Sequence, residues 1–199
     1  MRSRNSNVRR RIGGAAGVAV LAVAGLMAGG ATATAADSTV RAVSGPEVGP
    51  GEVSWAQCPQ GTELVGGGYA AAPAYTYGGA YSDTVRASAP SVSHPGAWAA
   101  QPHAGRIRAY ALCDSSSAPT RAVADYVRNG GDISYAQCPE NTNLVTGGYV
   151  INPVYSNGGT PYDSVDINAP SESRPNAWAA KSHTKEGQIQ AFALCRDVS

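Results

Sequence analysis

An internal duplication with a period of 80 residues constrains this chain more than any other feature of its sequence. Residues 53–103 align with residues 133–183 without a gap, and 27 of the 51 aligned positions are identical. The match continues upstream, where Arg41-Ala42-Val43 aligns with Arg121-Ala122-Val123. It resumes downstream after two extra residues in the second copy, where GRIRAYALC aligns with GQIQAFALC. The chain therefore contains one structural unit twice.

Each copy carries two cysteines at its edges, Cys58 with Cys113 and Cys138 with Cys195. Four cysteines allow three pairings. We expect pairing within each copy, because a unit that folded alone before the duplication would have carried its own bridge. Each bridge would close a loop of about 55 residues, which is worth roughly 4 kcal/mol of stability. A unit of about 80 residues needs such a bridge, since a core of that size is marginal.

Alternating apolar and polar residues predict short strands in each copy. In the first copy the predicted strands cover residues 53–58, 64–69, 84–89, 97–101 and 107–113, with turns at 59–62, 78–79 and 95–96. No helical period longer than about ten residues interrupts the sequence after residue 36, which is rich in Gly and Pro. We expect an all-β fold, either two tandem disulfide-stapled β-sandwich-like repeats or one pseudo-symmetric sandwich built from both.

The first 36 residues have the pattern of a signal peptide. Five arginines precede an uncharged stretch from Ile12 to Ala36 that ends in small residues, and Arg9-Arg10-Arg11 favours the twin-arginine route. Without these five arginines, ten Lys and Arg remain against fourteen Asp and Glu, a formal net charge of −4. A mildly acidic mature chain argues against nucleic-acid binding. We expect a secreted, extracellular protein with no membrane segment after cleavage.

The remaining chain divides into an extended N-terminal segment and the two repeats. The segment covers residues 37–52, the first repeat 53–114, a linker 115–119 and the second repeat 120–199. The N-terminal segment could pair as an edge strand or remain a free peptide that adds itself to a partner's sheet or cleft. Val40, Arg41 and Val43 are its candidate contact residues.

Tyrosines and glycines cluster in the variable stretch of each copy. The candidate binding residues there are Tyr75, Tyr77, Tyr81 and Asp83 in the first copy and Tyr155, Tyr162 and Asp163 in the second. Loop tyrosines supply large contact areas at low entropic cost and also stack on sugar rings. Tyrosines that merely cap the sandwich are the alternative.

The sequence also contains the residue types of a serine hydrolase. Asp83, Ser91, Ser93 and His103 recur as Asp163, Ser171, Ser173 and His183. No nucleophile turn of the G-x-S-x-G kind accompanies these serines, which lie in polar segments bounded by proline. The histidines and aspartates also lack the spacing of zinc or calcium ligands. We therefore expect no catalytic site, no metal and no cofactor.

Two further features of the repeat are expected to be structural. Gly66-Gly67-Gly68 lies in a strand pattern rather than before a helix, which favours close backbone packing or a bulge under a neighbouring aromatic ring over phosphate binding. Trp98 and Trp178 are expected to anchor the two cores beside the disulfides.

The repeat carries the patterns C-P-x-x-T-x-L-V-x-G-G-Y, A-P-S-x-S-x-P-x-A-W-A-A and A-[YF]-A-L-C. With these it resembles a cysteine-bounded β repeat of secreted actinobacterial proteins. The overall plan is similar to that of the small adaptor subunits of streptomycete umbrella toxin particles. That resemblance implies an adaptor that joins a toxin stalk to a lectin subunit, with its N-terminal segment in the lectin cleft, and it implies no catalytic residues.

These observations predict a secreted, non-enzymatic binding or adaptor protein that joins other extracellular proteins, with lectin and toxin subunits as expected partners. Two alternatives remain open. A carbohydrate-binding module would use the loop tyrosines to stack on glycans, and a secreted protease inhibitor would present a disulfide-bridged loop.

Overall fold

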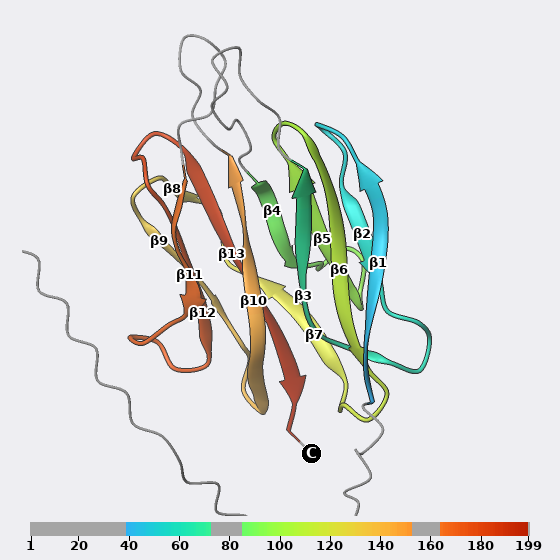
Figure 1. Cartoon of the computed structure of the whole chain (residues 1–199). Coiled ribbons are helices and arrows are strands. Elements are labelled where there is room, and N and C mark those ends of the chain that lie inside the picture. Colours follow the sequence, from blue (N-terminus) through green and yellow to red (C-terminus); the bar gives the residue numbers. More distant parts are fainter. Residues whose placement is uncertain (1–38, 73–84, 153–163, 199) are drawn as a thin grey trace, which may run out of the picture. The chain divides into compact units, whose positions relative to one another are not determined.

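The computed structural model describes residues 39–72, 85–152 and 164–198 (Figure 1). Within these ranges the chain forms β-strands and no helix, so no helix there could span a membrane. The strands of the first copy are β1 Val40–Val48, β2 Ser54–Gln57, β3 Glu63–Ala72, β4 Val85–Pro90, β5 Ala97–Pro102 and β6 Arg106–Asp114. Those of the second copy are β7 Thr120–Ala124, β8 Arg128–Asn129, β9 Ile133–Gln137, β10 Thr142–Asn152, β11 Val165–Pro170, β12 Ala177–Ser182 and β13 Gln188–Asp197.

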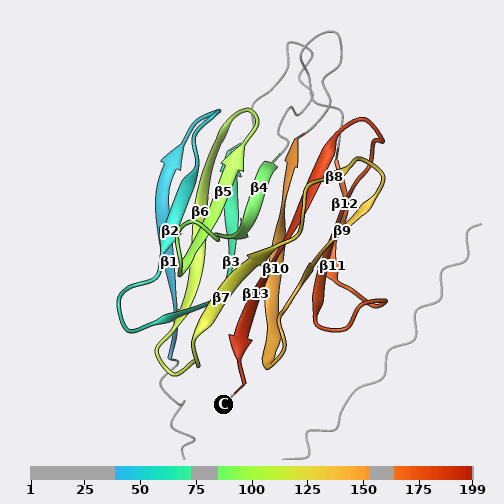
Figure 2. The same cartoon turned by 180° about the vertical axis from the view of Figure 1, so that it is seen from behind.

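Each copy builds two antiparallel layers, and one layer of each copy joins the other copy. In the first copy these layers are β1-β6-β3 and β2-β5-β4, and in the second they are β7-β13-β10 and β9-β12-β11. β4 pairs with β10, which produces one seven-stranded sheet across both copies (Figure 2). The predicted all-β class and tandem repeats are therefore confirmed. The copies are not separate sandwiches, however, because they share a sheet.

The core of each copy lies between its two layers. In the first copy the buried cluster includes Leu64, Trp98 and Ile107, and in the second it includes Ile151 and Ile189. Buried residues alternate with more exposed ones along β6, so one face of this strand lies in the first cluster, whereas β13 is buried on both faces. Alanine is the most frequent residue in both clusters, and its small side chain lets the layers approach closely.

The disulfides join Cys58 to Cys113 and Cys138 to Cys195, as expected for pairing within each copy. Both bridges are buried in their cores, and the Cα atoms are 5.6 Å apart in each pair. Two disulfides fit an oxidising extracellular environment.

The predicted turns at residues 59–62 and 95–96 are present, and each needs one residue in the left-handed region. Gly61 and Gly96 take φ values of 80° and 75° in the first copy. Asn141 and Asn176 occupy the equivalent positions with φ values of 62° and 61°. Asparagine is the side-chain-bearing residue that tolerates this region best, so both copies keep the same turns with different residues.

Part of the N-terminal segment is an edge strand rather than a free peptide. β1 pairs antiparallel with β6 from Val40 opposite Asp114 to Val48 opposite Ile107, with a bulge between Ser44 and Glu47. At the bulge, the Ser54 hydroxyl donates to the Pro46 carbonyl at 2.6 Å and accepts from the Ala109 amide at 2.9 Å. This buried serine fastens β1 to the rest of the repeat.

In the second copy a carboxylate reinforces the same position. Ser134 is equivalent to Ser54, and its hydroxyl donates to Asp125 at 3.0 Å. The Asp125 carboxylate also accepts from the Tyr135 amide at 2.9 Å and pairs with Arg128 at 3.1 Å. Burial would raise the pKa of Asp125, but the hydrogen bonds from Arg128 and the Tyr135 amide outweigh it and hold the pKa below its usual range.

We expect Asp125→Asn to lower the free energy of unfolding at pH 7 by about 1–2 kcal/mol, because the charged acceptor is lost. A carboxyl with a lowered pKa stabilises the fold above its unfolded pKa, near 3.9, and that contribution is lost as the pH falls through the folded value. The variant should therefore lose less stability than the wild type between about pH 4 and pH 2. Urea unfolding at several pH values measures this, with the exposed Asp132→Asn as control. Parallel pH profiles for wild type and D125N would contradict it.

Candidate functional site

The predicted loop residues lie outside the described part of the chain. These are Tyr75, Tyr77, Tyr81, Asp83, Tyr155, Tyr162 and Asp163. Their stretches connect β3 to β4 and β10 to β11, at equivalent places in the two copies.

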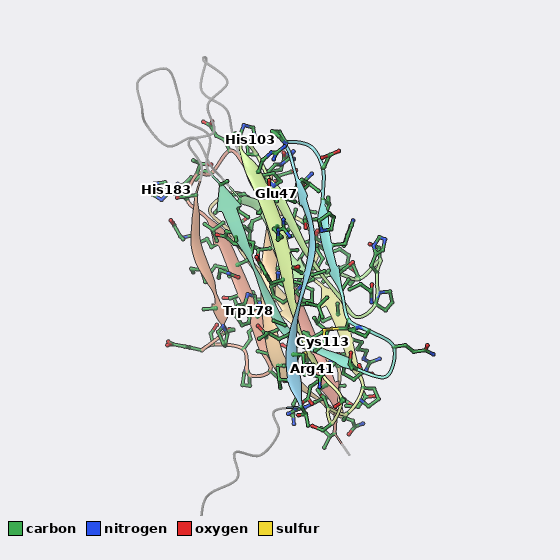
Figure 3. All side chains as sticks on the ribbon, turned by 45° about the vertical axis from the view of Figure 1, so that its right-hand side comes forward. Arg41, Glu47, His103, Cys113, Trp178 and His183 are labelled. Carbon is green, nitrogen blue, oxygen red and sulfur yellow. A yellow bond between two sulfur atoms is a disulfide. The ribbon has the colours of Figure 1, made fainter. Side chains whose placement is uncertain are left out.

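The three candidate residues of the N-terminal segment lie on β1. Arg41 and Val43 line a pocket of about 540 Å³, together with Pro59, Thr62 and Cys113. Arg41 and Cys113 are opposite each other in the β1–β6 register and lie at the same end of the repeat, whereas His103 lies at the other end (Figure 3). The pocket is therefore next to the first disulfide, at the β1 side of the core.

Val40 points to the opposite side of the sheet from Arg41. It pairs with Asp114, and it shares the outer face with Leu112 because the side chains of a strand alternate between its faces. Tyr110 lies on the same face, two residues from Leu112. Val40, Tyr110 and Leu112 are all exposed. We call these three side chains, together with the outer edge of β3 from Gly67 to Ala72, the β3–β6 surface.

The equivalent residues of the second copy are buried. Leu112 is 42% exposed and Leu194 is 2% exposed, while Tyr110 is 37% exposed and Phe192 is 8% exposed. At the strand edge, Tyr69 is 45% exposed and Tyr149 is 9% exposed. Two equivalent units therefore present the same positions in opposite environments.

The cause of this difference is the contact between the repeats. Leu194 belongs to the buried cluster of the first repeat, and Val145 packs against that cluster. The phenol of Tyr149 donates to the Val85 carbonyl at 3.3 Å, and burial raises its pKa. The second repeat thus covers the first with β10 and β13. Among the described residues, nothing covers the equivalent β3 and β6 in the same way.

Val40 is among the contact residues predicted from the sequence, whereas Tyr69, Tyr110 and Leu112 are not. Nothing local separates Leu112 from Leu194, because both are in the sequence Ala-Leu-Cys. A weak signal exists on the neighbouring strands, where Ala70-Ala71 in β3 replaces the larger Val150-Ile151 of β10. The smaller side chains lie on β3, whose outer edge has no paired strand among the described residues, and the larger ones lie on β10, which pairs with β4.

The serine and histidine of the hydrolase hypothesis lie at opposite ends of β5. Ser93 is in the turn before the strand, and its hydroxyl lies 3.0 Å from Nδ1 of His94. His103 directly follows the strand, so six intervening strand residues separate the two by roughly 20 Å. The pKa of His103 is lowered, first by burial and then by Arg86. The structure therefore does not bring Ser93 and His103 together.

The equivalent turns of the two copies stack a side chain on an aromatic ring. The ring centroids of His94 and Trp55 lie 4.1 Å apart, and in the second copy the Arg174 guanidinium lies 4.1 Å above the Tyr135 ring.

His183 pairs with Asp166 at 3.0 Å on the exposed side of the second repeat. In the described ranges, no three His, Cys, Asp or Glu residues converge as metal ligands would.

Comparison with known proteins places this chain in no family. No protein-family model matches it, and a search of curated proteins finds no match. The chemistry of the candidate site therefore has to be judged from its own residues. The β3–β6 surface offers apolar and tyrosine side chains beside an uncovered strand edge, which suits contact with another polypeptide.

Proposed function

We propose that this chain is a secreted, non-enzymatic binding protein that joins other extracellular proteins through the β3–β6 surface. The observation that carries the proposal is the contrast between the exposed Tyr110 and Leu112 and their buried equivalents Phe192 and Leu194. Where a partner is present, in the second repeat, this face is an interface. The same face in the first repeat has the composition of an interface, and its Tyr110 and Leu112 are exposed.

Three further observations support the proposal. The expected signal peptide and the two disulfides fit an extracellular location. The outer edge of β3 offers backbone groups to which an extended segment of another protein could add as a strand. The resemblance to umbrella-particle adaptors makes lectin and toxin subunits the partners to look for. The tyrosines of the carbohydrate-binding alternative lie outside the described residues, so no observation favours it over a protein partner.

The proposal predicts that Leu112→Glu releases the partner. A carboxylate at this position would be desolvated in an apolar contact, so recovery of the partner should fall at least about tenfold. The measurement is affinity purification of the tagged protein from its producer's culture medium under non-reducing conditions, with mass spectrometry of co-eluting chains.

Tyr126→Glu is the matched control, because Tyr126 is exposed outside the β3–β6 surface and should leave recovery unchanged. Both variants should melt within a few degrees of the wild type, since surface substitutions have small effects. Recovery of the tagged chain with no co-eluting chain of any kind, an untagged copy of itself included, or equal recovery with L112E, would overturn the proposed function.

A further inference from the structure

The contact between the two repeats joins unlike edges. β4 of the first repeat pairs with β10 of the second, with Ser88 opposite Tyr149 and Ala87 opposite Val150. By the duplication, β4 is equivalent to β11 and β10 is equivalent to β3. Both of these equivalents are terminal strands of three-stranded sheets in the described structure. A head-to-tail contact of this kind leaves one unpaired edge of each type, on β3 in the first repeat and on β11 in the second.

The unused edge of the second repeat is exposed where its equivalent is buried. Ser88 and Pro90 of β4 are buried, while Asn168 and Pro170 of β11 are exposed. The core behind this edge shows the same difference. Leu64 and Trp98 are almost fully buried, whereas Leu144 and Trp178 are only half-buried. The second repeat therefore lacks, among the described residues, the cover that Leu194 and Val145 provide for the first.

Two glycines provide an independent argument. At Gly148 a Cβ atom would overlap the Ser88 carbonyl oxygen and lie 2.7 Å from Cα of Ala89, so the β4–β10 contact requires glycine there. Gly68 is the equivalent residue of β3, and a Cβ there would meet no atom within 4 Å. Its φ lies outside the left-handed region. Nothing within the described chain requires glycine at position 68, although a strand docked on β3 as β4 is docked on β10 would require it.

We propose that copies of this chain associate head to tail, with β11 of one copy pairing with β3 of the next as β4 pairs with β10. The register follows from the internal contact, with Tyr69 opposite Asn168 and Ala70 opposite Ile167. Leu112 of the second chain then covers the core around Leu144 and Trp178 of the first chain, as Leu194 covers the core of the first repeat. This inference rests on the proposed function, because it names the partner of the same β3–β6 surface.

Each chain has one unpaired edge on β3 and one on β11, so association continues beyond a dimer. Depending on the rotation between successive copies, the product is a closed ring or an open filament. The internal β4–β10 contact acts as the template, because every new contact repeats one already present within the chain.

The test uses sedimentation velocity of the purified protein over a wide concentration range. The wild type should form species larger than dimers, and Gly68→Val should sediment as a monomer with an unchanged melting temperature. Gly49→Val is the matched control, because Gly49 is also in open space but lies outside the contact. Ala169→Lys blocks the other edge, since its equivalent Ala89 is buried in the β4–β10 contact.

Mixing the two blocked variants gives the sharpest result. G68V retains the β11 edge and A169K retains the β3 edge, so each alone should be monomeric and a mixture should form heterodimers and nothing larger.

A monomeric wild type, or association of G68V as strong as that of G49V, would overturn the head-to-tail inference. If a monomeric wild type still captures another protein in a Leu112-dependent way, only this inference fails. If no chain of any kind binds the β3–β6 surface, the proposed function fails as well.

Discussion

Gly67→Ala is expected to lower the free energy of unfolding by about 3 kcal/mol, at the upper end of the usual cost of overpacking a core. A Cβ atom on Gly67 would overlap the indole ring of Trp98. Trp98 cannot easily move away, because it is buried and its Nε1 donates to the Ser88 hydroxyl at 3.3 Å. The added methyl group therefore forces a shift of β3 or of β5.

The next residue supplies a matched control for this prediction. Gly68→Ala makes the same chemical change on the same strand, but its Cβ meets no atom within 4 Å, so stability should change by less than about 0.5 kcal/mol. Urea unfolding of both variants measures the difference. Equal free energies of unfolding for G67A and G68A would show that β3 does not pack against Trp98 at Gly67. Gly147→Ala should repeat the effect of G67A in the second copy, since its Cβ would overlap Trp178.

The local structure of this chain could be predicted from its sequence because the signals are local. Alternating residues define β2 to β6, and Gly61 and Gly96 define the turns between them. The duplication then assigned each cysteine pair to one copy. The expected packing of glycine under an aromatic ring is also confirmed, at Gly67 with Trp98 and at Gly147 with Trp178.

The contact between the copies could not be predicted in this way. Strand patterns show which face of a strand is apolar, but they do not show which sheet edges meet. β4 and β11 share Val, Ala and Pro at equivalent positions, yet only β4 has a neighbour on its outer edge among the described strands. The difference arises from position, because the two repeats use different edge strands in their contact, β4 in the first and β10 in the second. For this reason Tyr110 and Leu112 could not be recognised as surface residues from the sequence.

Replacement of both Cys58 and Cys113 by alanine is expected to lower the free energy of unfolding by about 4 kcal/mol. The bridge spans 55 residues, and the chain-entropy relation gives this value for a loop of that length. Because the disulfide is part of the buried cluster, loss of its packing adds to the effect. Calorimetry of the double variant under oxidising conditions measures the change, with the Cys138 and Cys195 double variant as its counterpart.

The same experiment shows whether the repeats unfold as one unit. Leu194 of the second repeat is part of the first repeat's core, and Thr120 donates to the Leu64 carbonyl at 3.0 Å and to Glu63 at 2.9 Å. Unfolding of the first repeat would expose Leu194 and remove the partner of β10, so destabilising one repeat should lower the melting temperature of both. We therefore expect a single transition in the wild type and in each double variant. Two separate transitions, with the second repeat unaffected by loss of the Cys58–Cys113 bridge, would mean that the β4–β10 contact contributes little to stability.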